Sequence, residues 1–165
     1  TFHGVDAYGD SYSYYVCQLI PSEAPIQLPS CPDGWTRSVT EPGKCYYMLS
    51  QVAYTTARTQ WQNISANHGD LAVPDLQSEA EELSMLAGWS SNTPTWIGLD
   101  RLAGGWNWVT PENSTAQWWC SGQPDTAQNP THKCAAIDPL GCWTSYDCTA
   151  LSRAMCQIPA QPTAN

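Results

Sequence analysis

The sequence predicts a domain of the α+β class, in which two helices lie between short β-strands. Apolar residues recur at helical spacing in two stretches, one at residues 52–68 and one that begins at Ser78. Stretches rich in aromatic and β-branched residues stand before and after them, at residues 45–48 and 95–99. Eight cysteines in 165 residues are the third observation, because they predict disulfides that hold a loop-rich domain together.

Length and charge exclude several classes of protein. A chain of 165 residues fits one domain, and 42% hydrophobic against 13% charged residues argues against disorder. The formal net charge is −9, and six scattered Lys and Arg residues cannot form a phosphate-binding groove, so we expect no nucleic acid partner. No apolar run approaches the ~20 residues of a membrane span, and no signal peptide precedes Thr1, which predicts a mature, processed form.

The cysteines also predict an oxidising compartment. A metal site is the alternative, but the sequence has no CxxC pair, and His3, His68 and His132 lie far apart. Two sequons, at Asn63 and Asn113, support a glycoprotein. We therefore expect a secreted, extracellular protein.

The chain divides into an N-terminal extension at residues 1–30, a main domain at 31–159 and a tail at 160–165. Within the extension, residues 12–20 (YSYYVCQLI) predict a strand, and three prolines after it predict an extended spacer. Residues 16–21 are similar to residues 155–159 near the C-terminus. This similarity is either a coincidence or a sign of two strands of one kind.

The two helices are predicted from their apolar stripes. In the first helix, Tyr54, Ala57, Trp61 and Ile64 share one face. The second helix is expected to open at Ser78 with Glu81 in the capping-box position. Its buried face should hold Leu76, Ala80, Leu83 and Ala87, with Met85 and Leu86 widening that face.

Further strands are expected at residues 95–99, 133–137 and 150–158, and a hairpin is expected around Cys31 and Cys45. Trp106 and Trp108 alternate with Asn107, so they should lie on one face of a strand.

Residues 118–148 are expected to form the functional end of the molecule. They contain four of the eight cysteines, three tryptophans and the tripeptide Gln123-Pro124-Asp125, with no helical pattern. A rigid loop that displays amides, a carboxylate and indole rings is typical of a binding surface. An enzyme is not expected, because GxSxG, HExxH and a recognisable carboxylate pair are absent and an even cysteine count leaves no thiol nucleophile.

These motifs together resemble the C-type lectin-like domain over residues 31–158. The resemblance is carried by the ordered series CPDGW, CYY, two amphipathic helices, GDLA, WIGL, WNW, GQPD, KC, GCW and the final Cys-x7-Cys. It implies a compact α+β fold, with two helices flanking two small antiparallel sheets, paired termini and a long disulfide-braced loop that carries the ligand site. The opening hairpin is similar to the long form of the family.

The resemblance also implies disulfides. It pairs Cys31 with Cys45 and Cys134 with Cys148. The helical partner of Cys156 in the family is replaced here by Ile64, so burial is expected to replace that bond. Of the four remaining cysteines, Cys120 and Cys142 could brace the loop, and elimination pairs Cys17 with Cys156.

Calcium binding in sugar-binding members of the family depends on residues that this chain only partly keeps. Gln123-Pro124-Asp125 matches a tripeptide that the family associates with galactose-type ligands, and its proline is typically cis. The family's glutamate position is taken by His132, and Thr144 and Ser145 replace Asn and Asp. Calcium prefers about six to eight oxygens, and Gln123 and Asp125 supply two. We expect no cofactor; if calcium binds, Gln123 and Asp125 hold it.

The expected ligand-binding residues are Gln123, Asp125, His132, Trp118, Trp143, Thr144 and Ser145. Each has a plainer interpretation. The tripeptide could be an ordinary turn, and His132 either a loop residue or a direct hydrogen-bond partner of the ligand. Trp143 is favoured as a core residue together with Trp96, Trp106, Trp108 and Trp119, although Trp118, Trp119 and Trp143 could stack on a sugar.

The predicted function is that of a secreted lectin-like module that binds a glycan or glycoprotein, without the family's calcium site. The alternative is an extracellular structural subunit that assembles with copies of itself. In that alternative, the N-terminal strand around Cys17 pairs with the final strand around Cys156 of the same or a neighbouring molecule.

Overall fold

The structure is a computed structural model, and it describes residues 29–64, 69–88, 92–110 and 114–162 together with two short N-terminal strands. These strands, β1 (His3–Val5) and β2 (Ser11–Ser13), pair antiparallel in a sheet of their own. Most of the strand expected at residues 12–20 lies outside the described residues, as does Cys17.

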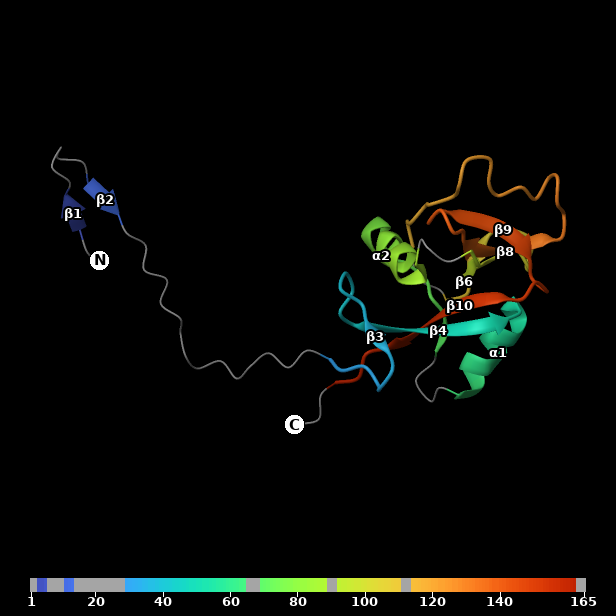
Figure 1. The fold of residues 1–165 in the computed structure, drawn as a ribbon, viewed down its shortest axis with the longest axis horizontal. Helices are drawn as coiled ribbons and strands as arrows, with labels where there is room; N and C mark the ends of the chain where they lie inside the picture. Colours follow the sequence, from blue (N-terminus) through green and yellow to red (C-terminus); the bar gives the residue numbers. More distant parts are fainter. Residues whose placement is uncertain are drawn as a thin grey trace.

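The main domain contains one hydrogen-bonded mixed sheet (Figure 1). Its strands are β3 (Thr36–Arg37), β4 (Lys44–Val52), β5 (Asp70–Leu71), β6 (Thr95–Asp100), β7 (Asn107–Trp108), β8 (His132–Ile137), β9 (Trp143–Asp147) and β10 (Ser152–Pro159). They run in the order β3-β4-β10-β6-β8-β9, while β5 pairs with β10 and β7 with β6. The α+β class is confirmed. The strands join into one sheet because β10 runs parallel to β6 and antiparallel to β4, which links the two halves.

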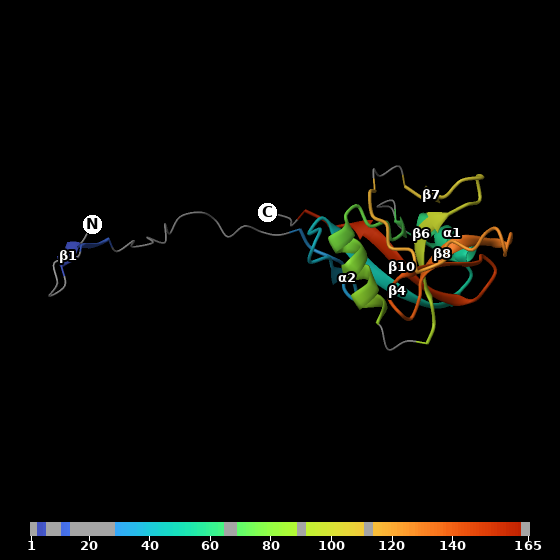
Figure 2. The ribbon, with the colours of Figure 1, turned by 90° about the horizontal axis from the view of Figure 1, so that it is seen from above.

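Two helices cover separate parts of this sheet (Figures 1 and 2). Helix α1 (Tyr54–Ile64) packs with one core cluster and α2 (Gln77–Ala87) with a second one. Strand β10 contributes to both clusters, since Met155 packs in the cluster of α2 and its neighbours Ala154 and Cys156 in the cluster of α1. Alternate residues of a strand point to opposite faces, so the sheet separates the two cores.

The apolar stripe of α1 is confirmed where side chains are described. Tyr54, Ala57 and Trp61 are all buried. The helix is shorter than residues 52–68, because Val52 still belongs to β4. Ile64 is its last residue, and the side chain of Ile64 lies outside the described residues.

Helix α2 has a different start from the predicted one. Leu76 is the N-cap and makes no side-chain capping bond, so the capping box of Ser78 and Glu81 is wrong. Ala80, Leu83 and Ala87 are buried as predicted, whereas Leu76 is 56% and Met85 63% exposed.

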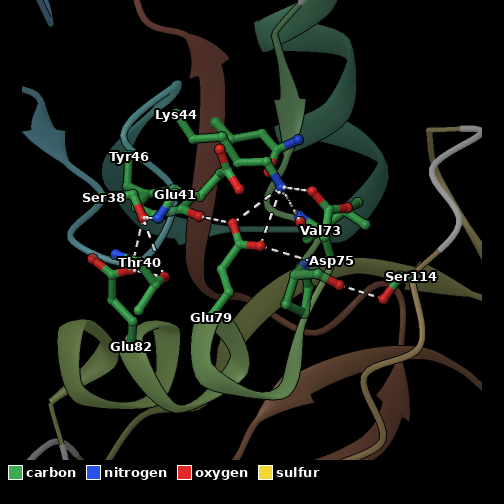
Figure 3. Close-up of polar contacts among 12 residues, drawn as sticks. Ser38, Thr40, Glu41, Lys44, Tyr46, Val73, Asp75, Glu79, Glu82 and Ser114 are labelled. Atoms are coloured by element: carbon green, nitrogen blue, oxygen red, sulfur yellow. Dashed lines mark hydrogen bonds and ion pairs between the residues drawn. The ribbon is translucent and has the colours of Figure 1, made fainter. Parts of the chain in front are cut away.

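A buried polar network fixes the orientation of α2 against β4 (Figure 3). The carboxylate of Glu79 is 1% exposed and accepts hydrogen bonds from the Tyr46 hydroxyl and from the backbone N–H of Asp75 at 2.7 Å. Lys44 Nζ lies 3.0 Å from Glu79 Oε1 and 2.8 Å from Asp75 Oδ2. Burial raises the pKa of Tyr46, and the Glu79 carboxylate raises it further, so Tyr46 remains a donor at any physiological pH. These contacts set the rotation of α2, and they turn Leu76 and Met85 outward.

Three disulfides lie in the described part of the chain: Cys31–Cys45, Cys120–Cys142 and Cys134–Cys148. They are the same pairs as those expected. The expected bond between Cys17 and Cys156 is absent, since Cys156 is a free thiol with 0% exposure. The physical reason is its position in the middle of the sheet, where Tyr47 of β4 lies opposite Cys156 on one side and Leu71 of β5 on the other.

The two ends of the domain are paired. Ser30 N–H donates to the carbonyl of Gln161 at 2.8 Å, and Gln161 N–H donates back to Ser30 at 2.9 Å. Ser30 and Gln161 lie just outside the expected domain limits, residues 31 and 159. Their hydrogen bonds therefore join the start of the domain to its end.

Candidate binding site on the long loop

The long loop leaves the sheet after β7 and returns at β8 (Figure 2). The Cys120–Cys142 disulfide ties the loop to the turn before β9, and Trp143 N–H donates to the Trp118 carbonyl at 2.7 Å. Cys120 N–H in turn donates to the Trp143 carbonyl at 2.8 Å. The loop is therefore held to the edge strand by covalent and backbone bonds.

The tripeptide Gln123-Pro124-Asp125 contains a cis peptide bond before its proline. Both flanking side chains turn toward Ser145 of β9, which is 1% exposed. Gln123 Oε1 accepts hydrogen bonds from the backbone N–H and from the hydroxyl of Ser145, each at 3.0 Å. Asp125 Oδ1 lies 2.6 Å from the same hydroxyl.

Asp125 has two further partners. Asn129 Nδ2 donates to its Oδ2, and Nδ1 of His132 lies 3.1 Å from its Oδ1. The pKa of Asp125 is lowered, chiefly by the hydrogen bond from Ser145 and then by those from Asn129 and His132. Asp125 is therefore ionised at neutral pH and is already satisfied from within the chain.

The residues at the positions of the family's calcium ligands do not fit a calcium ion. The oxygens of Gln123 and Asp125 face N–H and O–H donors of Ser145, which a cation would have to displace. Thr144 Oγ1 points to Cys120 Sγ at 3.4 Å, and His132 presents a ring nitrogen in place of a carboxylate. Among the residues that the structure describes, no group of three His, Cys, Asp or Glu could hold a metal.

The tryptophans separate into core and surface. Trp143 is 1% exposed and packs edge-on against Trp108 at 5.5 Å and Trp119 at 5.9 Å. The favoured interpretation of Trp143 as a core residue is therefore confirmed, and its burial contradicts the alternative in which it stacks on a sugar. Trp106 and Trp119 contact each other at 4.9 Å and pack against the core. Trp118 is half-buried, packs against the same core cluster, and lines a cavity beside α2 to which neither Gln123 nor Asp125 contributes.

The exposed part of the site is a polar rim, formed by Asp125, Asn129, His132 and Asp147. The side chains of His132 and Asp125 are 28% and 22% exposed. His132 lies opposite Asp147 in the β8–β9 pair, and its ring stacks on Tyr146 with centroids 6.4 Å apart. Sequence reasoning missed Asn129 and Tyr146, because nothing in the chain order indicates that a turn and a strand bring them to His132.

The sequons have different outcomes. Asn63 is exposed in the last turn of α1. Asn113 lies outside the described residues.

The comparisons place this chain in a known family. A family model described as the lectin C-type domain matches residues 50–158, which is more than half of the chain. The protein therefore belongs to the C-type lectin domain family. Lectin C-type domains are binding modules, so the family assigns the chain to binding proteins and not to enzymes. No curated protein matches the sequence significantly.

Solved structures support the same fold. The carbohydrate-recognition domain of cow CD23, determined with a GlcNAc2Man3 oligosaccharide, is 25% identical with a TM-score of 0.69 over 81% of this chain and 99% of that one. The corresponding domain of human scavenger receptor C-type lectin is 21% identical, with a TM-score of 0.66 over 79% and 99%. A calcium-independent type II antifreeze protein is 22% identical, with a TM-score of 0.64 over 82% and 98%.

Neither helix in the described part of the main domain has the length and apolar content that a membrane crossing requires.

Proposed function

We propose that this chain is a secreted lectin-like module that binds a glycan or glycoprotein without calcium, through the polar rim. Family membership and the likeness to carbohydrate-recognition domains support the ligand class. The observation that carries the proposal is the pair of hydrogen bonds from Ser145 to Gln123 and Asp125. They occupy the oxygens that calcium would need, while the side chains of His132 and Asp125 stay 28% and 22% exposed at the rim. Carboxylate, amide and imidazole groups are suitable partners for sugar hydroxyls.

Secretion is supported by the three disulfides, which persist in oxidising compartments. Loop rigidity supports binding as well, because a site that is ordered beforehand loses less entropy when a ligand binds. The galactose-type preference rests on the tripeptide alone. Since its side chains turn toward Ser145, we propose that the rim sets the selectivity and that galactosides are the first ligands to test.

A glycan array probed with calcium and again with EGTA tests this function. We expect the same glycans under both conditions, with galactosides bound at least as well as mannosides. Asp125→Asn and His132→Ala should each reduce binding about tenfold, because each removes a charge-assisted or direct hydrogen bond worth about 1.5 kcal/mol.

The matched control is Asp33→Asn, which changes an exposed carboxylate in the turn before β3, outside the polar rim. It should bind as the unchanged protein does. Absence of any glycan signal, or a signal that EGTA abolishes, would overturn the proposal.

The alternative of a filament linked by Cys17 and Cys156 is not supported. Strand β10 is paired with β4 on one side and with β5 and β6 on the other, so it has no free edge for another strand. The Cys156 thiol is fully buried as well.

A further inference from the structure

A cavity of about 360 Å³ lies between α2 and the turn that joins β8 to β9. Its lining residues are Glu81, Ser84 and Met85 of α2, Trp118 of the long loop, and Leu140 and Gly141 of the turn. None of these residues belongs to the polar rim. A volume in this range is typical of small-ligand pockets, which hold about 300–1,000 Å³.

The walls of this α2–Trp118 pocket are held in place. The hydroxyl of Ser84 donates to the Gly141 carbonyl, which joins the helix to the turn. The turn is closed by Gly141 N–H to Asp138 at 2.7 Å and by the neighbouring Cys120–Cys142 disulfide. The backbone carbonyl of Trp118 accepts a hydrogen bond from the N–H of Trp143. The pocket is therefore formed before any ligand arrives, which reduces the entropy cost of binding.

The pocket is apolar where it meets solvent. Leu140 is 84% and Met85 63% exposed, and Trp118, which lines the same pocket, is half-buried. Covering apolar surface contributes about 25 cal/mol per Å², so these three side chains favour an apolar or aromatic occupant. Sugar hydroxyls would find few partners here, because the Ser84 hydroxyl and the Gly141 carbonyl already bond to each other.

Glu81 supplies the one charge in this lining. Its side chain is exposed and has no hydrogen bond or ion pair with any described residue. The chain as a whole carries a net charge of −9, which favours cationic partners at long range. The N-terminal extension is not a suitable occupant, since residues 1–28 hold Asp6, Asp10 and Glu23 but neither Lys nor Arg.

We propose that the α2–Trp118 pocket docks a peptide segment of a protein partner that presents an aromatic side chain next to Lys or Arg. The ring contacts Met85, Trp118 and Leu140, and the cation lies opposite Glu81. A cation within reach of Trp118 also gains from the face of the indole ring. This docking site is independent of glycan binding at the rim.

The test uses the full chain, labelled with ¹⁵N, and two probe peptides, Ac-Lys-Phe-Lys-NH₂ and Ac-Glu-Phe-Glu-NH₂. The indole N–H signal of Trp118, identified with a Trp118→Phe variant, should shift saturably with the lysine peptide and stay in place with the glutamate peptide. Glu81→Gln should weaken the lysine peptide about three- to fivefold, as expected for one exposed ion pair. Leu140→Ala should weaken it by a similar factor, and Asp33→Asn should leave it unchanged.

Three results would overturn the proposal. The first is no shift of the Trp118 signal at millimolar lysine peptide. The second is equal binding of the two peptides, or equal binding of Glu81→Gln and the unchanged protein. The third is a shift confined to the signals of Asp125 and His132, which would place the peptide at the rim. Glycan binding should be unchanged in Glu81→Gln, so the proposal for the pocket can be tested separately from the proposal for the polar rim.

Discussion

The hydroxyl of Ser145 lies 2.6 Å from Oδ1 of Asp125, and through it the two ends of the tripeptide are closed onto β9. A hydroxyl has one proton, so Ser145 Oγ donates to either Asp125 or Gln123 at a given moment. The backbone N–H of Ser145 still satisfies Gln123 Oε1, and the N–H of Asp125 donates to Ser145 Oγ at 3.1 Å. The loop oxygens thus have internal donors where a calcium site would need free lone pairs.

The first prediction concerns calcium. The unfolding temperature should be the same in calcium and in EGTA, because the ion has no set of free carboxylates to bind. Thermal unfolding at several calcium concentrations measures this directly.

A grafted variant supplies the positive control for calcium. His132→Glu, Thr144→Asn and Ser145→Asp together restore the residue types of the calcium-binding pattern that the tripeptide resembles. We expect this triple variant to gain an unfolding temperature that rises with calcium. Stabilisation of the unchanged chain by micromolar calcium, lost in Asp125→Ala, would contradict the prediction.

The second prediction concerns Glu82, which is 5% exposed in α2 (Figure 3). Its burial opposes ionisation, but hydrogen bonds from Thr40, from the N–H of Val39 at 2.6 Å and from Ser38 at 2.7 Å outweigh that effect and lower its pKa. We expect Glu82→Gln to lower the free energy of unfolding by about 1.5–3 kcal/mol at neutral pH.

The pH dependence of the Glu82 contribution follows from the sign of this shift. A carboxyl whose folded pKa is depressed stabilises the fold above its unfolded pKa, about 4.3, and that stability is lost as the pH falls through the folded value. The difference between Glu82→Gln and the unchanged protein should therefore be largest above about pH 5 and shrink below about pH 4. Denaturant unfolding of both proteins at pH values above and below this range measures the difference. Glu81→Gln, the exposed neighbour, is the control and should show no such trend; a constant difference at all pH values would refute the mechanism.

Local patterns predicted much of this fold. The stripe of Tyr54, Ala57 and Trp61 is buried because helical spacing alone places these residues on one face. The predicted strand at residues 95–99 is β6, since its β-branched and aromatic run is itself local. Leu76 and Met85 are exposed for a non-local reason: Glu79 must reach Lys44 and Tyr46, and that contact decides the rotation of α2.

The site shows the same division. The resemblance brought Gln123, Asp125 and Ser145 together, and they do contact each other. It could not indicate that Ser145 bonds to both oxygens, because that depends on the directions of side chains 20 residues apart, on the loop and on β9. Trp118 was expected to bind ligand together with the tripeptide; it lines a cavity with residues of α2, a contact for which the sequence offers no signal.

The third prediction concerns the thiol of Cys156. Burial raises its pKa, and its exposure is 0%, so the thiol should resist alkylation in the native protein. It should react in denaturant without any reductant, because no disulfide protects it. Mass mapping with iodoacetamide checks both steps, and Cys120 and Cys142 serve as controls that react only after reduction. A disulfide-linked peptide that contains Cys17 and Cys156, found under non-reducing conditions, would show that Cys156 is not a free thiol.

The last prediction concerns Gly98, in the middle of β6. A Cβ added there would lie 2.6 Å from Val109 Cγ2 and 2.8 Å from the backbone oxygen of Leu71. The backbone at this point cannot retreat, because Gly98 N–H donates to Ala72 and its carbonyl accepts from Val109, each at 2.8 Å.

Gly98→Ala should therefore lower the free energy of unfolding by about 3 kcal/mol through overpacking, measured by chemical denaturation. Gly105→Ala is the matched control, since the nearest atom to its Cβ, Asn107 Nδ2, lies 3.8 Å away. In an open turn the same substitution changes stability by less than about 1 kcal/mol, because it mainly reduces the entropy of the unfolded chain. If the two variants were equally stable, the packing of β5 and Val109 against Gly98 would have to be looser than these distances indicate, and the prediction would be wrong.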